Sequence, residues 1–533
     1  MQNCLAVLCA VISVSSVAAR DYYVSPRGDD SGAGTLAKPW RTIDKLNAQT
    51  FAPGDRVLFE GGQVFAGTLR IAAGTQKLAI TSYGDGRATI RAGNAQAMVV
   101  EGATGVSVRN LKLTGAGRKT GNTTSGLLFK ASTNVEADHI EVSGFRRSGI
   151  ELDGVENARI THIHAHENGF AGISSAGAMS RNIYVGYSLA ENNPGDPGIR
   201  RNHSGNGIVI GRVRSALIEH CEARYNGWDQ PWTGNGPVGI WTYDSDRVVI
   251  QFNVAHHNRS TGQDGGGFDL DGGVTNAIVQ YNYSHSNFGT GYLICQYAGA
   301  GTFADNVVRY NISQDDGLKD HDAGIFVWVG GPGMKSTLVH NNTIFNSKGS
   351  AVAFGVAKDY TGPMPVFTFY NNIFVSQGPQ IKGGAEKGRF VGNLYWSVGE
   401  RGFHVDSYTD LGAWTAATGQ EQWQGRLVGI YADPRLRKDG NGLLTDPDQL
   451  ETLHEYQLPA GSPAIDAGLD LRALFRIDPG RRDYYGAAIP SGSAFDVGAH
   501  EFTDGAARVS QRSADPMARP GPAPPARQRS RRD

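Results

Sequence analysis

Two aspartates two residues apart, Asp269 and Asp271, are the side chains of this sequence best placed to do chemistry together. Residues 268–271 read Phe-Asp-Leu-Asp, and such an alternation of apolar and acidic residues is typical of a strand with one buried face. Both carboxylates would leave the same face, about 7 Å apart. Glycines at 265–267 and 272–273 leave room for another molecule to approach. A carboxylate pair on a rigid strand suits cleavage of a glycosidic bond.

This strand belongs to a repeat that begins near residue 100 and contains short strands and turns without a helical pattern. Its clearest marker is an asparagine that recurs about every 30 residues, at Asn253, Asn282, Asn311, Asn342 and Asn372. A period of this length indicates a stacked architecture, and strands without helices predict an all-β parallel β-helix. We expect the asparagines to form an inward ladder between coils.

A second column of polar side chains follows the first at a distance of five residues. Its members are Asn168, Asn193, Asn226, Asn258, Asn287 and Asp316. The neighbouring pair Asp315 and Asp316 invites a catalytic interpretation, but the column predicts a structural role for Asp316.

The repeat frame also predicts what surrounds Asp269 and Asp271 on the outer face. The outward positions of neighbouring coils are Trp241 and Tyr243 before them, then Leu293 and Cys295, then Phe326 and Trp328. Coils stack about 4.8 Å apart, so the acidic pair would lie in an aromatic groove suited to sugar rings. Trp241, Tyr243, Phe326 and Trp328 are therefore predicted to bind substrate. The alternative is that loops cover this face and the aromatic side chains belong to the core.

Three further acidic residues are candidates for the same groove. Asp264 could orient a catalytic carboxylate or bind substrate, while Glu151 and Asp153 lie on the same face several coils away and could bind a remote sugar. The histidines His256, His257 and His285 fall on a different face. His256 and His285 share a column that could bind a metal, but we interpret these histidines as surface residues.

The ends of the chain differ in composition from the repeats. Residues 1–19 read as a secretory signal, and residues 503–533 as a disordered basic tail. Between them we expect an N-terminal cap with the first coils (20–100), the repeats (101–395) and an irregular closing segment (396–502). Thr42 is predicted to cap a short helix near the start. A formal charge of −1 argues against nucleic-acid binding, and no other stretch is apolar enough to span a membrane. We expect a secreted or periplasmic monomer with two thiols, Cys221 and Cys295, that form no disulfide.

Both ends of the mature chain also resemble a known superfamily. Residues 22–26, with Gly28–Asp30, Gly34–Thr35 and Pro39, resemble the opening of secreted pectate-lyase-like proteins, and residues 458–468 and 496–499 resemble their ending. The resemblance implies a single-stranded right-handed parallel β-helix with an N-terminal cap. It implies carbohydrate activity only in general, because the superfamily includes lyases, hydrolases, epimerases and adhesins.

Two subfamilies can be compared with residues of this chain. Family-nine pectate lyases look similar around 264–270, but the acidic cluster that completes their calcium site has no equivalent at 287–291. Their lysine base is also missing, and the nearest basic side chains are Lys319 and His321. Polygalacturonase-type hydrolases are similar in placing aspartates on outward strand positions, although their full motif set is absent. Metal-independent β-helix glycosidases are the nearer analogy.

The sequence therefore leads to three hypotheses. The first is a glycoside hydrolase without a cofactor or bound metal, in which one of Asp269 and Asp271 is the general acid and the other the nucleophile or base, acting on a polysaccharide or oligosaccharide. The second is a calcium-dependent lyase or epimerase acting on uronic acid polymers, with Ca²⁺ held by Asp264, Asp269 and Asp271 and a base supplied by Lys319 or His321. The third is a non-catalytic carbohydrate-binding surface protein.

Overall fold

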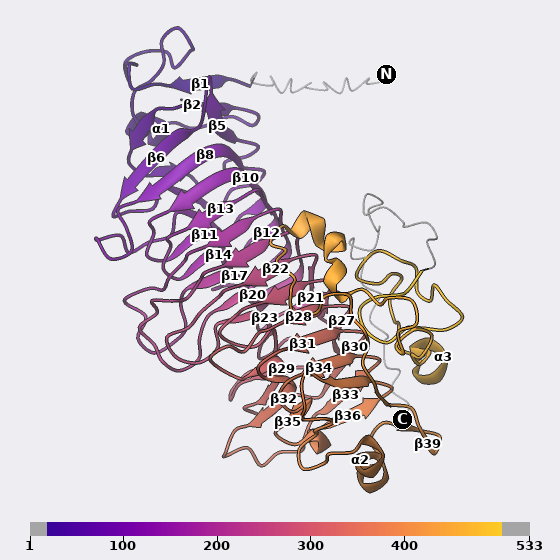
Figure 1. Cartoon of the computed structure of the whole chain (residues 1–533). Helices are drawn as coiled ribbons and strands as arrows, with labels where there is room; N and C mark the ends of the chain where they lie inside the picture. Colours follow the sequence, from indigo (N-terminus) through magenta and orange to yellow (C-terminus); the bar gives the residue numbers. More distant parts are fainter. Residues whose placement is uncertain (1–18, 504–533) are drawn as a thin grey trace, which may run out of the picture.

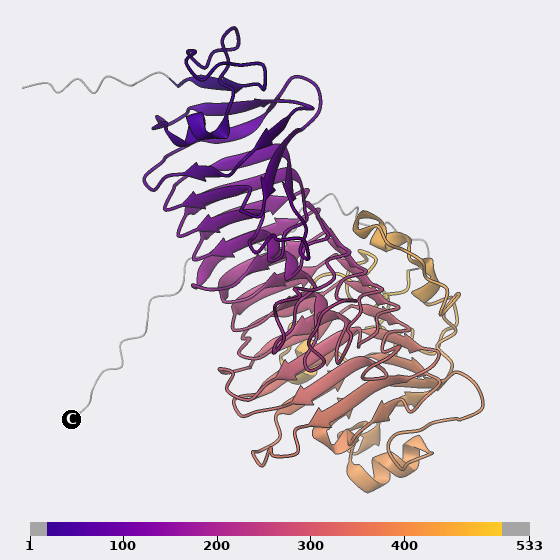
Figure 2. The same ribbon diagram turned by 90° about the vertical axis from the view of Figure 1, so that its left-hand side faces the viewer.

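The computed structural model describes residues 19–503 as a long stack of parallel β-coils (Figure 1). The chain folds as the predicted all-β right-handed parallel β-helix. The predicted signal peptide and basic tail lie outside the described residues, apart from Ala19 and Thr503. Figure 2 shows the coils stacked along one axis from the N-terminal end to the helix α2 (Leu411–Thr418).

Each coil of the central repeats contributes one strand to each of three rows, and every strand pairs in parallel with the strand of the next coil. The first row contains β1 (Asp21–Val24), β2 (Arg56–Glu60), β5 (Ala79–Tyr83), β8 (Ser107–Gly115), β10 (Thr133–Ser143), β12 (Glu156–Thr161), β15 (Ser180–Gly186), β18 (Val213–Glu219), β21 (Asp246–Gln251), β24 (Ile278–Gln280), β27 (Asn306–Arg309), β30 (Ser336–His340), β33 (Val366–Tyr370) and β36 (Gly388–Val391). The second row, joined to the first through the long strands β8 and β10, contains β3 (Val64–Ala66), β6 (Ala88–Gly93), β13 (His164–His166), β16 (Leu189–Glu191), β19 (Glu222–Arg224), β22 (Val254–His256), β25 (Tyr283–His285), β28 (Ile312–Gln314), β31 (Thr343–Asn346), β34 (Ile373–Ser376), β37 (Leu394–Ser397) and β40 (Ile430–Tyr431).

The third row is a separate 12-stranded sheet, called here the pocket sheet. Its strands are β4 (Leu69–Ile71), β7 (Met98–Glu101), β9 (Leu127–Lys130), β11 (Ser148–Asp153), β14 (Ala171–Ser175), β17 (Asn206–Ile210), β20 (Val238–Thr242), β23 (Gly266–Leu270), β26 (Tyr292–Gln296), β29 (Ala323–Val329), β32 (Ser350–Val356) and β35 (Ile381–Lys382). Because side chains alternate along each strand, one set fills the interior and the other faces outward. The interior set stacks in register, as in the buried column Ile150, Ile173, Ile208, Ile240 and Phe268.

Both predicted ladders are confirmed. Nδ2 of Asn253 donates to Oδ1 of Asn282 over 2.9 Å, and the same bond repeats from coil to coil down this column. The ladder ends at Glu421, a buried carboxylate that accepts from Nδ2 of Asn393 over 2.7 Å. The second ladder ends at Asp316, whose Oδ1 accepts from Nδ2 of Asn287 over 2.8 Å. These bonds satisfy buried polar groups that would otherwise destabilise the stack.

Few helices interrupt this pattern. The short helix α1 (Ile43–Asn47) begins after Thr42, whose hydroxyl accepts from the Lys45 amide, so the predicted cap is confirmed. The remaining elements are the helix α3 (Leu471–Phe475), the 3₁₀ turns Ala385–Lys387, Pro447–Thr452 and His454–Tyr456, and the antiparallel pair β38 (Gln422–Trp423) and β39 (Arg426–Leu427).

The closing segment after β40, residues 432–503, returns along the outer side of the second row (Figure 1). The hydroxyl of Tyr283 donates to the Gly442 carbonyl over 3.1 Å, and the amide of Gly498 donates to the Asn371 carbonyl over 2.7 Å. Tyr283 and other apolar side chains of the second row are buried under this segment. The irregular C-terminal sequence therefore covers a face that the repeat pattern alone would leave open.

Two smaller expectations can be compared with the structure. Cys221 and Cys295 are both free thiols, as predicted. Within residues 19–503, no helix is both long and apolar enough to cross a membrane.

Candidate active site

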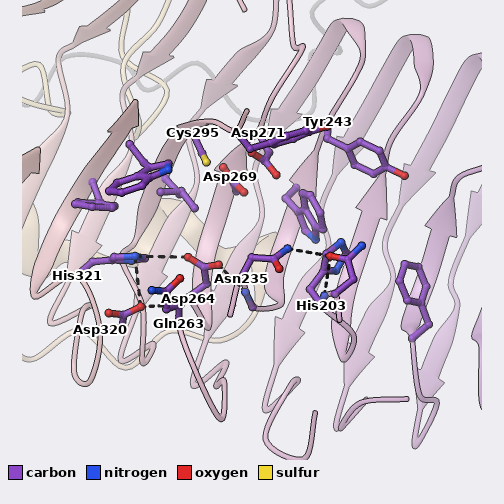
Figure 3. Close-up of a pocket in the computed structure, with 18 residues that line it drawn as sticks. His203, Asn235, Tyr243, Gln263, Asp264, Asp269, Asp271, Cys295, Asp320 and His321 are labelled. Carbon is purple, nitrogen blue, oxygen red and sulfur yellow. Dashed lines mark hydrogen bonds and ion pairs between the residues drawn. The ribbon is translucent and has the colours of Figure 1, made fainter. Parts of the chain in front are cut away.

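Asp269 and Asp271 lie on the floor of a pocket of about 630 Å³ (Figure 3). Strand β23 explains their direction, because Phe268 and Leu270 point into the core and are each 1% exposed. Parallel pairing then aligns Asp269 with Trp241 on β20 and with Leu293 on β26. The floor is formed by Trp241, Tyr243, Asp269, Asp271, Leu293, Cys295, Tyr297, Phe326 and Trp328. The predicted groove residues are thus together in one pocket.

Loops that precede the pocket-sheet strands form the walls. The main wall loops are residues 192–205, 225–237, 257–265 and 315–322, which connect the second row to β17, β20, β23 and β29. The walls contribute Phe170, Asn202, His203, Asn235, Gly236, Gln263, Asp264, Asp320 and His321. The core alternative holds for Trp241, which is 3% exposed and packs with Val209 and Val238, whereas Phe326 and Trp328 are partly exposed in the pocket.

Asp269 has the most unusual environment in the pocket. It is 4% exposed, and its Oδ1 is buried without a hydrogen-bond partner. Burial, followed by the negative charges of Asp271 and Asp264, raises the pKa of Asp269 well above its usual value. A carboxyl group in this position holds a proton where a free aspartate would have lost it, so it can act as a proton donor.

Asp271, just after β23, differs from Asp269 in having donors around its carboxylate. The Gly272 amide donates to its Oδ1 over 2.7 Å. Burial raises the pKa of Asp271 to about 6, while the Gly272 amide and the Cys295 thiol act against this rise. Asp271 is therefore mainly ionised at neutral pH. Burial and the nearby carboxylates raise the pKa of Cys295 well above its usual value, so it remains a thiol and not a reactive thiolate.

A second acidic group, formed by Asp264, Asp320 and His321, lies on the wall opposite the pair (Figure 3). Nε2 of His321 is 3.5 Å from Oδ1 of Asp264 and 3.4 Å from Oδ2 of Asp320. Oδ2 of Asp264 accepts from the Gly236 amide over 2.7 Å, and burial raises the pKa of Asp264 to about 6. Asp264 and His321 both adopt left-handed backbone conformations, with φ of 60° and 66°. The same conformation recurs at turns of successive coils, for example at Phe252, Tyr281 and Tyr310, so it belongs to the repeat and does not mark these two residues as functional.

Aromatic side chains are held at both ends of the pocket. At one end the rings of His203 and Trp241 meet edge to face, with centroids 4.9 Å apart, and Nε1 of Trp241 donates to Asn206 over 3.1 Å. Burial lowers the pKa of His203 to about 4, so this ring is neutral. At the other end His321 stacks on Phe326 at 4.1 Å. The acidic centre is therefore flanked by fixed apolar faces.

Some predicted residues do not reach the pocket. Glu151 accepts a short hydrogen bond from Ser125, and Oδ1 of Asp153 accepts from the Ala178 amide over 2.8 Å. Both lie on β11 outside the pocket lining, and their binding of a remote sugar stays a prediction. Nζ of Lys319 donates to the Ser260 and Thr261 carbonyls, over 3.0 and 3.1 Å, and also lies outside the lining.

Sequence reasoning missed several wall residues, namely His203, Asn235 and Asp320. They come from loops of unequal length that the repeat frame does not align.

The lining of the pocket carries an excess of negative charge, since lysine and arginine are absent from the described residues that line it. The site is acidic, with His321 as the one lining side chain that could carry a positive charge near the carboxylates.

Comparisons with known proteins agree with this fold. The family model described as a right handed beta helix region matches residues 198–374, and the chain matches no curated protein. Among solved structures it is similar to a GH136 lacto-N-biosidase from Eubacterium ramulus, with 19% identity, a TM-score of 0.45 and coverage of 60% of this chain and 64% of that one. It is also similar to pectate lyase Pel9A, with 17% identity, a TM-score of 0.41 and coverage of 92% and 98%. A variant of the PL6 family alginate lyase AlyGC gives 15% identity, a TM-score of 0.50 and coverage of 79% and 56%.

The chain thus spans slightly less than two thirds of the length of the lacto-N-biosidase. At these identities the likeness concerns the right-handed β-helix fold and not a particular reaction.

Proposed function

We propose that this protein is a carbohydrate-active enzyme that hydrolyses glycosidic bonds in the pocket over β20, β23, β26 and β29. The observation that carries the proposal is the pair of unlike carboxyl groups on the pocket floor. Asp269 is buried with an unpartnered oxygen and a raised pKa, whereas Asp271 accepts hydrogen bonds and is mainly ionised at neutral pH. A glycosidase needs one carboxyl group in each state.

In this mechanism Asp269 is the general acid. Its proton passes to the glycosidic oxygen as the bond to the sugar carbon breaks, and the leaving sugar departs as an alcohol. Asp271 carries the negative charge that faces the developing oxocarbenium ion, as nucleophile or as the base that activates water. Asp264 adds a second charge that favours the protonated form of Asp269.

Substrate binding would use the aromatic side chains. Tyr243 at one end and Phe326 and Trp328 at the other are partly exposed and present apolar faces on which sugar rings can pack, while the buried Trp241 supports Tyr243 from below. The cavity of about 630 Å³ suits one or a few sugar units. Because the lining lacks lysine and arginine, the pocket offers little to a uronate carboxylate and favours a neutral glycan.

A second candidate, the calcium-dependent lyase or epimerase, has one observation in its favour, a cluster of possible metal ligands in the pocket. These ligands are Asp264, Asp320 and His321, and not the predicted set of Asp264, Asp269 and Asp271. Calcium takes six to eight oxygen ligands, and this cluster includes an imidazole. The donor set therefore does not fit calcium well, and the proposed mechanism takes no step through a metal. The third candidate is carbohydrate binding without catalysis.

Two further parts of the proposal concern the location of the protein and its oligomeric state. The N-terminal sequence favours export to the periplasm or the medium, where polysaccharides and oligosaccharides are accessible. We propose that the enzyme acts as a monomer, because the pocket is built from one chain.

Product analysis on a panel of neutral and acidic glycans, with and without EDTA, tests this function. We expect new reducing ends without the ultraviolet absorbance of an unsaturated product, and no effect of EDTA. The activity should be lost in Asp269→Asn and Asp271→Asn but kept in Asp244→Asn, a matched control because Asp244 is an exposed carboxylate near the pocket. An EDTA-sensitive unsaturated product would instead identify a lyase. Glycan binding that survives Asp269→Asn, without any product, would support the binding protein.

A further inference from the structure

We infer that the chain contains a second ligand site, a transition-metal site formed by His256, His257 and His285. One ring nitrogen of each histidine lies within 4.8 Å of the others. Nδ1 of His256 and Nδ1 of His257 are only 2.8 Å apart. Two ring nitrogens this close either share one proton or bind one cation between them. When two imidazoles bind a single zinc ion, their coordinating nitrogens are about 3 Å apart.

The coil repeat brings these side chains together. His256 ends β22 and His285 ends β25, and the two residues are paired in register. Their rings are parallel, with centroids 4.7 Å apart. The ring of His257 stands at 84° to His256 and 89° to His285. The rings of His256 and His285 are therefore stacked, and the ring of His257 stands across the edge of that stack.

A carboxylate supports this arrangement from outside. Oε1 of Glu222, one coil earlier, lies 2.9 Å from Nε2 of His256. If Nε2 of His256 donates to Glu222, its Nδ1 is unprotonated and accepts the proton of His257 Nδ1, which a metal ion would replace. A ligating histidine whose other nitrogen donates to a carboxylate is the usual second layer of a metal site. Arg224 donates to the same Glu222 oxygen over 2.9 Å and holds it in place.

The histidines are not surface residues, as the sequence had suggested. His256 is 1% exposed among Glu222, Tyr225 and His285, and His285 is 2% exposed where Leu444 of the returning segment meets its ring. Burial and repulsion from the other two rings lower the pKa of His285 well below its usual value. Burial, His256 and the charge of Arg259 likewise lower the pKa of His257.

One ring nitrogen in the group is poorly satisfied. Nε2 of His285 is buried without a hydrogen bond of normal geometry, and the Leu444 backbone is only a weak hydrogen-bond partner of this ring. A poorly satisfied buried nitrogen is costly, and a cation held by the three rings would compensate for that cost.

The donor set indicates the class of metal. Three imidazoles suit zinc, copper or nickel, whereas calcium and magnesium take oxygen ligands. His257 is partly exposed and lies beside the exposed ring of Tyr225, which gives an ion access. None of the three histidines lines the pocket. His285 instead stacks on Tyr283, which bonds to Gly442 of the closing segment, so the ion would brace neighbouring coils under that segment.

Zinc binding by the full chain tests the inference. Metal-depleted protein is dialysed against zinc chloride, and bound zinc is measured by elemental analysis after gel filtration. We expect one retained zinc ion for each chain, and at least tenfold weaker binding in His257→Ala and in His285→Asn. His257→Ala is the safer variant for folding, because His257 is the one partly exposed member.

Two control variants distinguish this site from the other metal-ligand clusters of the described chain. His139→Ala changes the exposed group of Asp138, His139 and His162, and Asp320→Asn changes the cluster in the pocket. Both should keep the retained zinc. Cobalt substitution should give visible bands typical of tetrahedral nitrogen coordination, lost in His257→Ala. Zinc loss that follows Asp320→Asn or His139→Ala, or the absence of retained zinc in the wild type, would overturn the inference.

Discussion

Asp269 on the pocket floor and Asp316 at the end of the second ladder are both buried aspartates, yet their surroundings differ. The pKa of each is raised by burial, to about 7 for Asp316. Asp316 accepts from the Asn287 amide and side chain, and it shares a hydrogen bond of 2.7 Å with Ser313. Asp269 has an oxygen without any partner and lies in an open pocket.

The difference distinguishes an aspartate with a structural role from one that can take part in a reaction. A raised pKa alone reports burial, which both sites share. Both oxygens of Asp316 accept hydrogen bonds inside the coil, and Asp316 does not line the pocket described above. Asp269 lines that pocket, and its Oδ1 is buried without a partner. Unsatisfied polarity within a cavity is therefore the better guide to the site.

The largest expected effect is a difference in catalytic activity between variants of the two aspartates. Asp269→Asn removes the acid proton without changing shape and should lower kcat by about 10³-fold or more on substrates with poor leaving groups. Asp316→Asn keeps the ladder bonds and should leave kcat within about threefold. Steady-state kinetics of the two variants measure this difference. Equal losses of kcat in both variants would contradict the assignment of a catalytic role to Asp269 and a structural role to Asp316.

The free energy of unfolding should depend more on Asp316 than on Asp269. Asp316→Leu leaves the Asn287 amide groups and Ser313 without a partner, and should lower the free energy of unfolding by about 2–4 kcal/mol. Asp269→Leu removes a carboxyl whose Oδ1 was never satisfied, so it should be neutral or stabilising. Denaturant unfolding checks both, provided that the transitions are two-state. A more damaging Asp269→Leu would contradict this account.

Aromatic side chains of the pocket should affect binding more than chemistry. Trp328→Ala removes a partly exposed packing face of the pocket and should raise KM about tenfold with a smaller change in kcat. Trp241 and Trp414 of α2 are poor choices because both are buried, and their loss would leave a large cavity that destabilises the coil. Phe288→Ala, a change in a ring that lies outside the pocket, is better matched and should leave KM unchanged.

The pH dependence should sharpen the comparison further. Because Asp271 has a pKa of about 6, activity should fall as the pH drops below about 6 and this carboxylate becomes protonated. Asp316 affects stability instead. Its folded-state pKa of about 7 lies above the value of about 3.9 for a free aspartate, so the folded form holds more protons, and stability falls as the pH rises from about 4 to 7. Asp316→Asn should remove its contribution to the change of unfolding free energy with pH, which is at most about 1.4 kcal/mol per pH unit.

The smallest expected effect concerns the remote acidic residues. Glu151→Gln and Asp153→Asn change side chains outside the pocket and should leave kcat unaltered, with at most about a twofold change in KM on long substrates. A larger loss on long than on short oligosaccharides would establish the remote subsite that the sequence predicted.

The sequence predicts the pocket floor but only part of its walls, namely Asp264 and His321. Asp269, Asp271 and the aromatic positions follow from the coil register, since one repeat determines the face of the next. The wall residues His203 and Asp320 belong to loops that insert between strands and vary in length, so no period places them. The burial of His285 could not be predicted either, because Leu444 of an irregular segment more than 150 residues later meets its ring.

Infrared difference spectroscopy tests the central claim most directly, because it needs no substrate. The spectrum of the wild type at pH 7 minus that of Asp269→Asn should contain the carbonyl stretch of a protonated carboxylic acid, which isolates Asp269 from the other buried acids. We predict this band at neutral pH, together with its disappearance when the pH is raised well above 7. A difference spectrum that contains only carboxylate bands at pH 7 would mean that Asp269 is ionised and cannot be the general acid.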